Sequence, residues 1–226
     1  NALFPTLLGS TAAGWIAVTA FLLSSGRFAA ALALPGRHIA LLLLKSCIVG
    51  ASWTATYMAL RTLPITFAAP IRATGPLWTL AGAILLFSET PTGVQAVGMA
   101  LVVAGCVAFS RSAAREGIDF RHSRAVLFAF LGTVLGSCSA LYDKHLLKGL
   151  GIPSGTVLWW FMGGMCVIYA AAVAVSRQTP GRAAFRWRWT IPLVGVLLAL
   201  SDACYFTAVS FPDAKISVLS MIRRSS

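Results

Sequence analysis

The residues with the greatest capacity for chemistry are ionisable side chains inside long apolar stretches of the sequence. Arg72 lies well inside one such stretch, and Asp202 lies deep in another. A charge at the centre of a membrane-spanning helix costs about 2.5–3.5 kcal/mol on insertion scales, so these residues mark substrate or ion pathways. The planar guanidinium of Arg72 predicts capture of an anionic group. The structural alternative is pairing with helix-end carbonyls, with Asp143 or with Asp202.

Asp202 stands three residues before Tyr205, which places both side chains on one face of a helix. A buried carboxylate must be protonated or paired, so Asp202 is either a proton site or the partner of an arginine. The sequence leaves both interpretations open. We expect Tyr57 and Tyr205 to supply a ring and a hydroxyl to a cavity, although tyrosine is equally common in helix packing.

Asp143 and Lys144 stand near the end of an apolar stretch, beside His145. Neighbours on a helix point in different directions, so a direct pair between them is not expected. They are either pathway residues or a cluster that snorkels to the membrane interface. Lys45 lies near the start of its stretch and is also expected to snorkel. Trp53 and Trp78 are candidates for an aromatic cavity wall, with anchoring at the interface as the alternative.

Motifs of catalysis and metal binding are missing from the sequence. It holds no Gly-rich phosphate loop, no Ser/His/Asp arrangement and no H-E-x-x-H, and its five cysteines form no CxxC. We therefore expect no enzymatic activity, no cofactor and no metal site.

Composition sets the class of protein. The chain has 226 residues, of which 58% are hydrophobic and 11% charged, whereas about a quarter of a soluble domain is charged. So few polar groups exclude a soluble enzyme, a disordered chain and a fibrous repeat. The net charge of +12 is typical of loops that set membrane topology, not of a nucleic-acid-binding surface. The sequence predicts an all-α polytopic membrane protein.

The spans that must position these residues are bounded by Gly, Pro or charge. An eighth span begins near Ala214 and is truncated, no signal peptide is expected, and both ends of the chain look cut. The seven complete spans are Phe4–Leu23, Ile39–Leu60, Ile65–Phe87, Thr92–Phe109, Ala125–Leu147, Ser154–Val175 and Trp189–Phe211.

An internal repeat organises these spans. Laying Tyr57 on Tyr205 also lays Pro64 on Pro212, and brings the sixth and seventh spans onto the first and second. The sequence therefore predicts a first repeat over residues 1–110, a basic linker over 111–124 and a second repeat over 125–226. The complete unit would be five helices twice, which inverts one half relative to the other. Inverted repeats are typical of secondary transporters.

The chain resembles the EamA domain of the drug/metabolite transporter superfamily. The resemblance rests on Tyr57-Met-Ala-Leu, Pro64, Ala69-Pro-Ile-Arg72, Pro76-Leu77, Glu89, Gln95, Gly98 and Gly105, and in the second half on Ala140-Leu-Tyr-Asp-Lys144 and Ile222-Arg-Arg-Ser-Ser226. It implies a ten-helix transporter of small metabolites in the plasma (inner) membrane, working without ATP hydrolysis, of which this chain lacks the first helix and the last one and a half.

The same resemblance bears on single residues. It repeats Arg72 at Arg223, which would bring two guanidiniums towards one cavity. Glu89 belongs to the domain signature, yet its place between two helices suits capping of Thr92–Phe109, and we interpret it as structural together with Pro64 and Pro212.

The function expected is secondary transport of a small polar metabolite, anionic or carboxylate-bearing, with protons as a candidate coupling ion. The alternatives are a non-transporting scaffold or receptor, multidrug-type efflux of lipophilic compounds, and a membrane-embedded enzyme. Partners are the lipid bilayer and the metabolite, with no nucleic acid. Family resemblance would place the Arg-rich linkers Ser110–Arg124 and Ser176–Arg188 outside, whereas the positive-inside rule places them in the cytoplasm, and we predict the latter.

Overall fold

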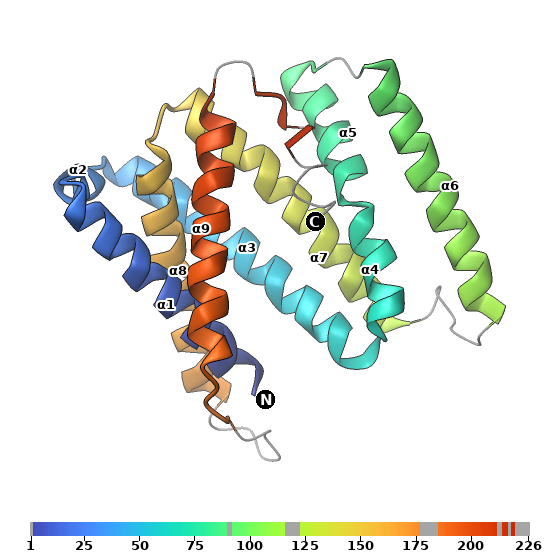
Figure 1. The fold of residues 1–226 in the computed structure, drawn as a ribbon, viewed down its shortest axis with the longest axis horizontal. Helices are drawn as coiled ribbons and strands as arrows, with labels where there is room; N and C mark the ends of the chain where they lie inside the picture. The colour runs from blue at the N-terminus through green and yellow to red at the C-terminus, as the bar shows by residue number, and fades with distance from the viewer. Residues whose placement is uncertain are drawn as a thin grey trace. The chain divides into compact units, whose positions relative to one another are not determined.

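Helices make up the whole of the secondary structure in the part of the chain that the computed structural model describes (Figure 1), namely residues 2–89, 92–115, 123–176, 185–211, 214–216 and 218–219. Their order is α1 (Leu3–Ser24), α2 (Phe28–Leu32), α3 (Gly36–Thr62), α4 (Ile65–Ala73), α5 (Gly75–Phe87), α6 (Gly93–Arg115), α7 (Arg124–Lys144), the π-helical turn η1 (His145–Gly149), α8 (Ser154–Ser176) and α9 (Thr190–Ser210).

Six of these helical segments are long and apolar enough to cross a membrane, counted over the described residues. They are α1, α3, the stretch Phe67–Phe87 that joins most of α4 to α5, α7 with η1, α8 and α9. In α6 the apolar part is the shorter stretch Gly93–Gly105. The expectation of a polytopic helical membrane protein is supported, because a helix satisfies its own backbone hydrogen bonds in lipid.

The helices differ most clearly from the expected spans in three respects. The stretch Ile65–Phe87 is two helices with a break at Thr74, and α6 continues past Phe109 to Arg115, into the expected linker. The five-residue α2 was not expected from the sequence. It is held by α8, where Nε1 of Trp160 donates to the carbonyl of Ala31 at 2.9 Å.

The chain divides into two compact units that do not follow the expected repeats. Unit 1 comprises Asn1–Gly50 and Asp143–Pro212, and unit 2 comprises Ala51–Tyr142 and Asp213–Ser226. Helices α3 and α7 therefore each contribute to both units. The repeat boundaries at 110 and 125 stay a prediction about the sequence.

In unit 1, α1 packs closely against both α8 and α9. Small residues bring α1 and α9 together: a Cβ added at Gly14 would lie 2.8 Å from the carbonyl oxygen of Gly195, and a Cβ at Gly195 would collide with the backbone of Ser10. Close backbone approach through small residues is the usual way in which helices associate in lipid. These contacts build the part of the molecule that holds the site described below.

In unit 2, the break between α4 and α5 has an identifiable cause. Pro76 has no backbone N–H, so it cannot bond the carbonyl of Arg72 one turn earlier, and it stands in the first turn of α5. Around the break, the N–H of Leu77 donates to Thr74 at 2.9 Å, and Oγ of Ser137 donates to the carbonyl of Gly75 at 2.9 Å. Side chains thus supplement the backbone hydrogen bonds beside the break, where the carbonyl of Ile71 also accepts the hydroxyl of Thr74 at 2.7 Å.

The junction between α5 and α6 shows how Glu89 is used. Helix α5 ends at Ser88, which adopts a left-handed conformation with φ of 52°. Helix α6 begins with a reciprocal cap, in which Thr92 N–H donates to Oε1 of Gln95 at 2.8 Å and Gln95 N–H lies 3.4 Å from Oγ1 of Thr92. A Glu89 carboxylate oxygen accepts the N–H of Ile216 at 3.4 Å, and a cap of α6 by Glu89 stays a prediction.

Candidate functional site

An ion pair buried in unit 1 is the centre of the candidate site. Lys45 of α3 donates through Nζ to a carboxylate oxygen of Asp143, at the C-terminal end of α7. The two residues are 1% and 3% exposed. Lys45 therefore does not snorkel as expected: its ammonium is turned into the protein, where a carboxylate replaces water. Pairing of this kind is what makes two charges tolerable in a membrane-spanning region.

Two aromatic rings complete the surroundings of the Lys45 ammonium. Nζ lies 4.8 Å from the ring centroid of Phe161 on α8 and 4.7 Å from that of Phe206 on α9. The rings meet at a centroid distance of 6.4 Å and an interplanar angle of 69°. A cation within about 6 Å of a ring centroid is attracted by the negative face of the ring. We call Asp143, Phe161 and Phe206 the ammonium cage.

Ser46 sets the register between the helix that carries Lys45 and the helix that carries Phe161. It is fully buried, and its Oγ lies 3.0 Å from the carbonyl oxygen of Phe161 and 3.1 Å from that of Leu42. The absence of a side chain at Gly164 makes the approach possible, because a Cβ there would lie 2.8 Å from Cβ of Ser46. Lys45 and Ser46 thus engage the ring and the carbonyl of the same phenylalanine.

A second carboxylate lies one helical turn from the cage. Asp202 on α9 is 3% exposed and stands four residues before Phe206, so both lie on one face of the helix. Tyr205, also buried, packs against Phe206 with ring centroids 5.7 Å apart. Lys45, Asp143 and Asp202 are the buried charged residues among those whose burial is described. All three belong to unit 1.

The helix that supplies Asp143 changes geometry directly after it. The π-helical turn η1 begins at His145 and ends at Gly149, and the N–H of Leu150 donates five residues back to His145 at 3.0 Å. The turn packs against α9 and α8. Single π-helical turns occur frequently at functional sites. Lys144, half-buried, and His145, exposed, follow Asp143 but are not members of the cage.

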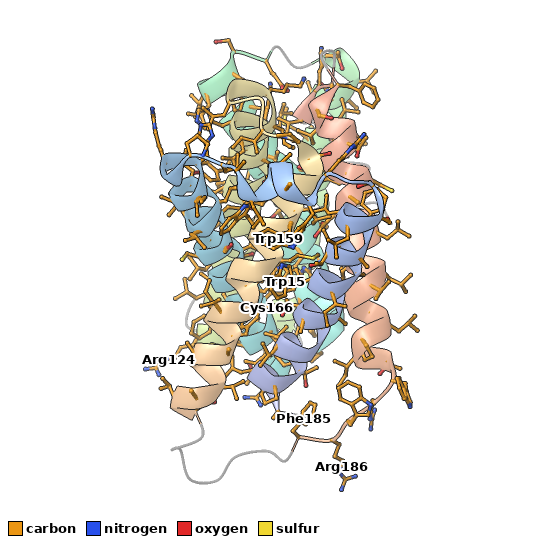
Figure 2. The ribbon with its side chains drawn as sticks, turned by 90° about the vertical axis from the view of Figure 1, so that its left-hand side faces the viewer. Trp15, Arg124, Trp159, Cys166, Phe185 and Arg186 are labelled. Atoms are coloured by element: carbon orange, nitrogen blue, oxygen red, sulfur yellow. The ribbon has the colours of Figure 1, made fainter. Side chains whose placement is uncertain are left out.

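An aromatic cluster lies elsewhere in unit 1, between α1 and α8 (Figure 2). The rings of Trp15 and Trp159 are 5.7 Å apart, and Phe28 meets Trp159 edge-on at 5.5 Å. Nε1 of Trp159 donates to Oγ1 of Thr19 at 2.9 Å. The cluster binds α1, α2 and α8 to one another. The segment that precedes α9, which includes Phe185 and Arg186, is exposed (Figure 2).

The expected pathway residues of the first repeat lie in unit 2. Arg72 is exposed, in the last turn of α4 beside the helix break. Trp78 on α5 is 40% exposed, and its ring meets Phe130 edge-on at 5.2 Å. Trp53 and Tyr57 are half-buried on α3. Pro64 precedes the first residue of α4 at its N-terminal cap.

Two of the expected residues cannot be placed. Arg223 and Pro212 lie outside the described residues, as do the central parts of both Arg-rich linkers, 116–122 and 177–184. The proposed pairing of Arg72 with Arg223 therefore stays a prediction. So does the anion-binding role assigned to them.

The sequence pointed to Asp143 as a functional residue, but it did not point to Lys45, Phe161 or Phe206. Asp143 and Asp202 were selected because they are charges in apolar stretches, and the same signal applied to Lys45. Its position near the start of the span favoured snorkelling instead. Phe161 and Phe206 had no such signal, because nothing separates them from the other phenylalanines among the 13 in the sequence.

Comparison with known proteins adds no identification. No family model matches the chain, and no curated protein matches it. The class of protein therefore rests on the chain itself: it is a multi-pass helical membrane protein with a buried ion pair inside one of its two compact units.

Proposed function

We propose that the chain is a secondary transporter of a small polar, charged metabolite, working by alternating access between inverted repeats of the EamA kind in the plasma (inner) membrane. The single observation that carries the proposal is the Lys45–Asp143 pair with Asp202 nearby on α9, all buried in membrane-spanning helices. Charged side chains buried inside membrane-spanning helices are characteristic of substrate and ion pathways. A scaffold has no need of them.

The discontinuous span in unit 2 supports the same proposal. Broken helices whose ends face a binding site recur in secondary transporters, since freed backbone groups in the membrane are tolerated where they line a cavity or are buried in protein. The break between α4 and α5 follows Arg72, at the end of α4. Beside it, the Ile71 carbonyl accepts the hydroxyl of Thr74, and the Gly75 carbonyl accepts the hydroxyls of Thr79 and Ser137.

The repeat is the second support. Aligning Tyr57 with Tyr205 brings α8 onto α1 and α9 onto α3. Under this alignment, the two halves place comparable helices in opposite orientations, which is the arrangement that alternating access requires.

The charge of the substrate needs to be considered again. The expectation of an anion rested on arginines inside the spans, and Arg72 is exposed while Arg223 lies outside the described residues. The buried charges are instead one lysine and two aspartates. We therefore propose a charged polar substrate, and the sign of its charge is taken up in the next subsection.

Transport by the purified chain in proteoliposomes tests the proposal. Vesicles with the native protein, incubated with a mixture of small amines, carboxylates, phosphate esters and lipophilic cations, should accumulate one class of compound in their lumen. The paired replacement Lys45→Met with Asp143→Leu should abolish this accumulation. Replacing a buried ion pair by apolar groups of similar volume is often neutral for stability, so the variant should stay folded.

A control variant separates an effect on transport from an effect on folding. A cysteine-to-serine change at exposed Cys47, beside the site but turned away from it, should leave accumulation unchanged. Equal accumulation by the native protein and the paired variant would refute the role of the pair. Selective accumulation of lipophilic cations would favour multidrug-type efflux over metabolite transport.

A further inference from the structure

We propose that the ammonium cage of Asp143, Phe161 and Phe206 is a binding site for the primary ammonium group of a substrate, and that Lys45 occupies it as a tethered stand-in until the substrate takes its place. The transport consequence of this inference rests on the proposed function. The binding site itself does not, and it can be tested without any measurement of transport.

The contacts of Nζ describe a site that suits an ammonium ion. One carboxylate oxygen of Asp143 accepts a hydrogen bond from it, and two phenylalanine rings lie below 5 Å from it, at 4.8 and 4.7 Å. Aromatic rings with a carboxylate are the usual means of recognising an organic cation. The three groups come from α7, α8 and α9, so the cage is formed by helix packing and none of its members lies on the helix that carries Lys45.

The groups around the ion pair indicate that a substrate would replace the ammonium of Lys45 and not the carboxylate of Asp143. In a buried ion pair, either the cation or the anion could occupy the place that a substrate group takes. Phenylalanine presents a negative face to the ion above it, which favours a cation and disfavours an anion. Asp202, one turn from Phe206, adds a second buried carboxylate. An incoming anion would therefore face two buried carboxyl groups as well as the negative faces of the two rings.

The side chain of Lys45 is able to move out of the ammonium cage. Its ammonium is a compact charge on a flexible stem of four carbons, with three donors that can follow a carboxylate or water. Its attachment to the protein also makes it a strong competitor, because a tethered group acts at an effective concentration in the millimolar range. Removing the stem should therefore open the site to a free amine.

Truncation of Lys45 provides the direct test. Lys45→Ala removes a fragment equivalent to n-propylamine and leaves the cage without its occupant. Equilibrium dialysis of radiolabelled n-propylammonium against the purified full chain should show at least a tenfold gain in affinity over the native protein. The neutral 1-propanol and the anionic propionate should not bind. The ligand should also raise the melting temperature of this variant.

Two controls make the result specific. Lys45→Ala combined with Asp143→Ala has the same space but no carboxylate, and it should not bind propylammonium. Lys144→Ala removes a half-buried lysine directly after Asp143, outside the cage, and should behave as the native protein does. Propylammonium binding that survives loss of Asp143, or a gain in affinity with Lys144→Ala equal to that with Lys45→Ala, would overturn the proposal.

A measurement on folded protein remains if Lys45→Ala does not fold. Native protein should bind propylammonium weakly, in the millimolar range, and the apolar pair Lys45→Met with Asp143→Leu should not. Propionate binding to native protein, lost with Lys45→Met, would identify Lys45 as an anion receptor and overturn the ammonium site. Amine binding without vesicle accumulation would support the cage and contradict the transporter. Accumulation in vesicles without amine binding would support the transporter and contradict the cage.

Discussion

At the scale of single residues, the chemistry of this protein depends on charges that a membrane-spanning region would exclude unless they were paired. Lys45 and Asp143 form a buried hydrogen-bonded ion pair, and the rings of Phe161 and Phe206 lie beside the ammonium. Desolvation opposes such a pair as strongly as attraction favours it. The pair is therefore better explained by function than by stability.

This balance makes a prediction about stability. Lys45→Met leaves the buried carboxylate of Asp143 without its ammonium and should lower the free energy of unfolding by about 3–5 kcal/mol. Adding Asp143→Leu should recover most of that loss, because the space is refilled by apolar groups and no charge is left unpaired. Thermal unfolding is measured for the native protein, the two single variants and the double variant. This double-mutant cycle gives the interaction free energy between Lys45 and Asp143. Additive losses would show that the two side chains do not interact.

At the scale of helices, small residues decide how closely the elements that carry the site approach one another. Gly195 lets α9 lie against the backbone of Ser10 on α1, and Gly164 lets α8 accept the hydroxyl of Ser46 on α3. In lipid there is little hydrophobic gain in bringing two helices together, so packing distance and interhelical hydrogen bonds determine the arrangement. The positions of Phe161 and Phe206 around Lys45 follow from these two crossings.

A pair of glycine substitutions tests this account. Gly195→Ala places a methyl group against backbone atoms of Ser10, the nearest carbon at 2.8 Å, and backbone cannot turn aside as a side chain can. We expect a loss of about 1–3 kcal/mol, as for other overpacked cores, seen as a lower melting temperature.

Gly98→Ala is the matched control for this prediction. It lies in α6, where an added Cβ would meet nothing within 4 Å. Its higher helix propensity should make it neutral or stabilising by up to about 1 kcal/mol. Similar melting temperatures for the two variants would contradict a close crossing between α1 and α9.

At the scale of the whole molecule, the distribution of positive charge along the chain bears on its orientation in the membrane. The two Arg-rich segments expected as linkers, Ser110–Arg124 and Ser176–Arg188, contain eight basic residues, namely Arg111, Arg115, Arg121, Arg124, Arg177, Arg182, Arg186 and Arg188. Two spans lie between them along the chain, so both linkers emerge on the same side. Short basic loops stay in the cytoplasm.

Cysteine labelling tests this orientation. In a cysteine-free version of the protein, single cysteines at Gly117 and Gly181 should be protected from an impermeant thiol reagent on intact cells and should react after the cells are opened. A cysteine introduced on the connection between α7 and α8, at Gly151, should show the opposite pattern. Reaction of the Gly117 and Gly181 positions on intact cells would place the linkers outside, as the family resemblance implies.

The sequence alone was enough for the class of the molecule and for most of its helices. Whether a stretch can cross a bilayer depends on its own length and apolar content, which are local properties. Helix α8, expected at Ser154–Val175, runs from Ser154 to Ser176. The burial of Asp202 was foreseen for the same reason, since it stands far from either end of its span. The fold class could therefore be predicted without any knowledge of neighbours.

Only the tertiary structure decided which charges meet. Lys45 and Asp143 are separated by 98 positions, and no periodicity along the chain reports which helices become neighbours or how each is rotated about its axis. Near the start of its span, Lys45 could either reach water or turn inward. The choice depended on a carboxylate from α7 and on rings from α8 and α9. A site formed by three or more helices is a property of their packing, because its energy comes from distances between side chains that the chain itself does not link.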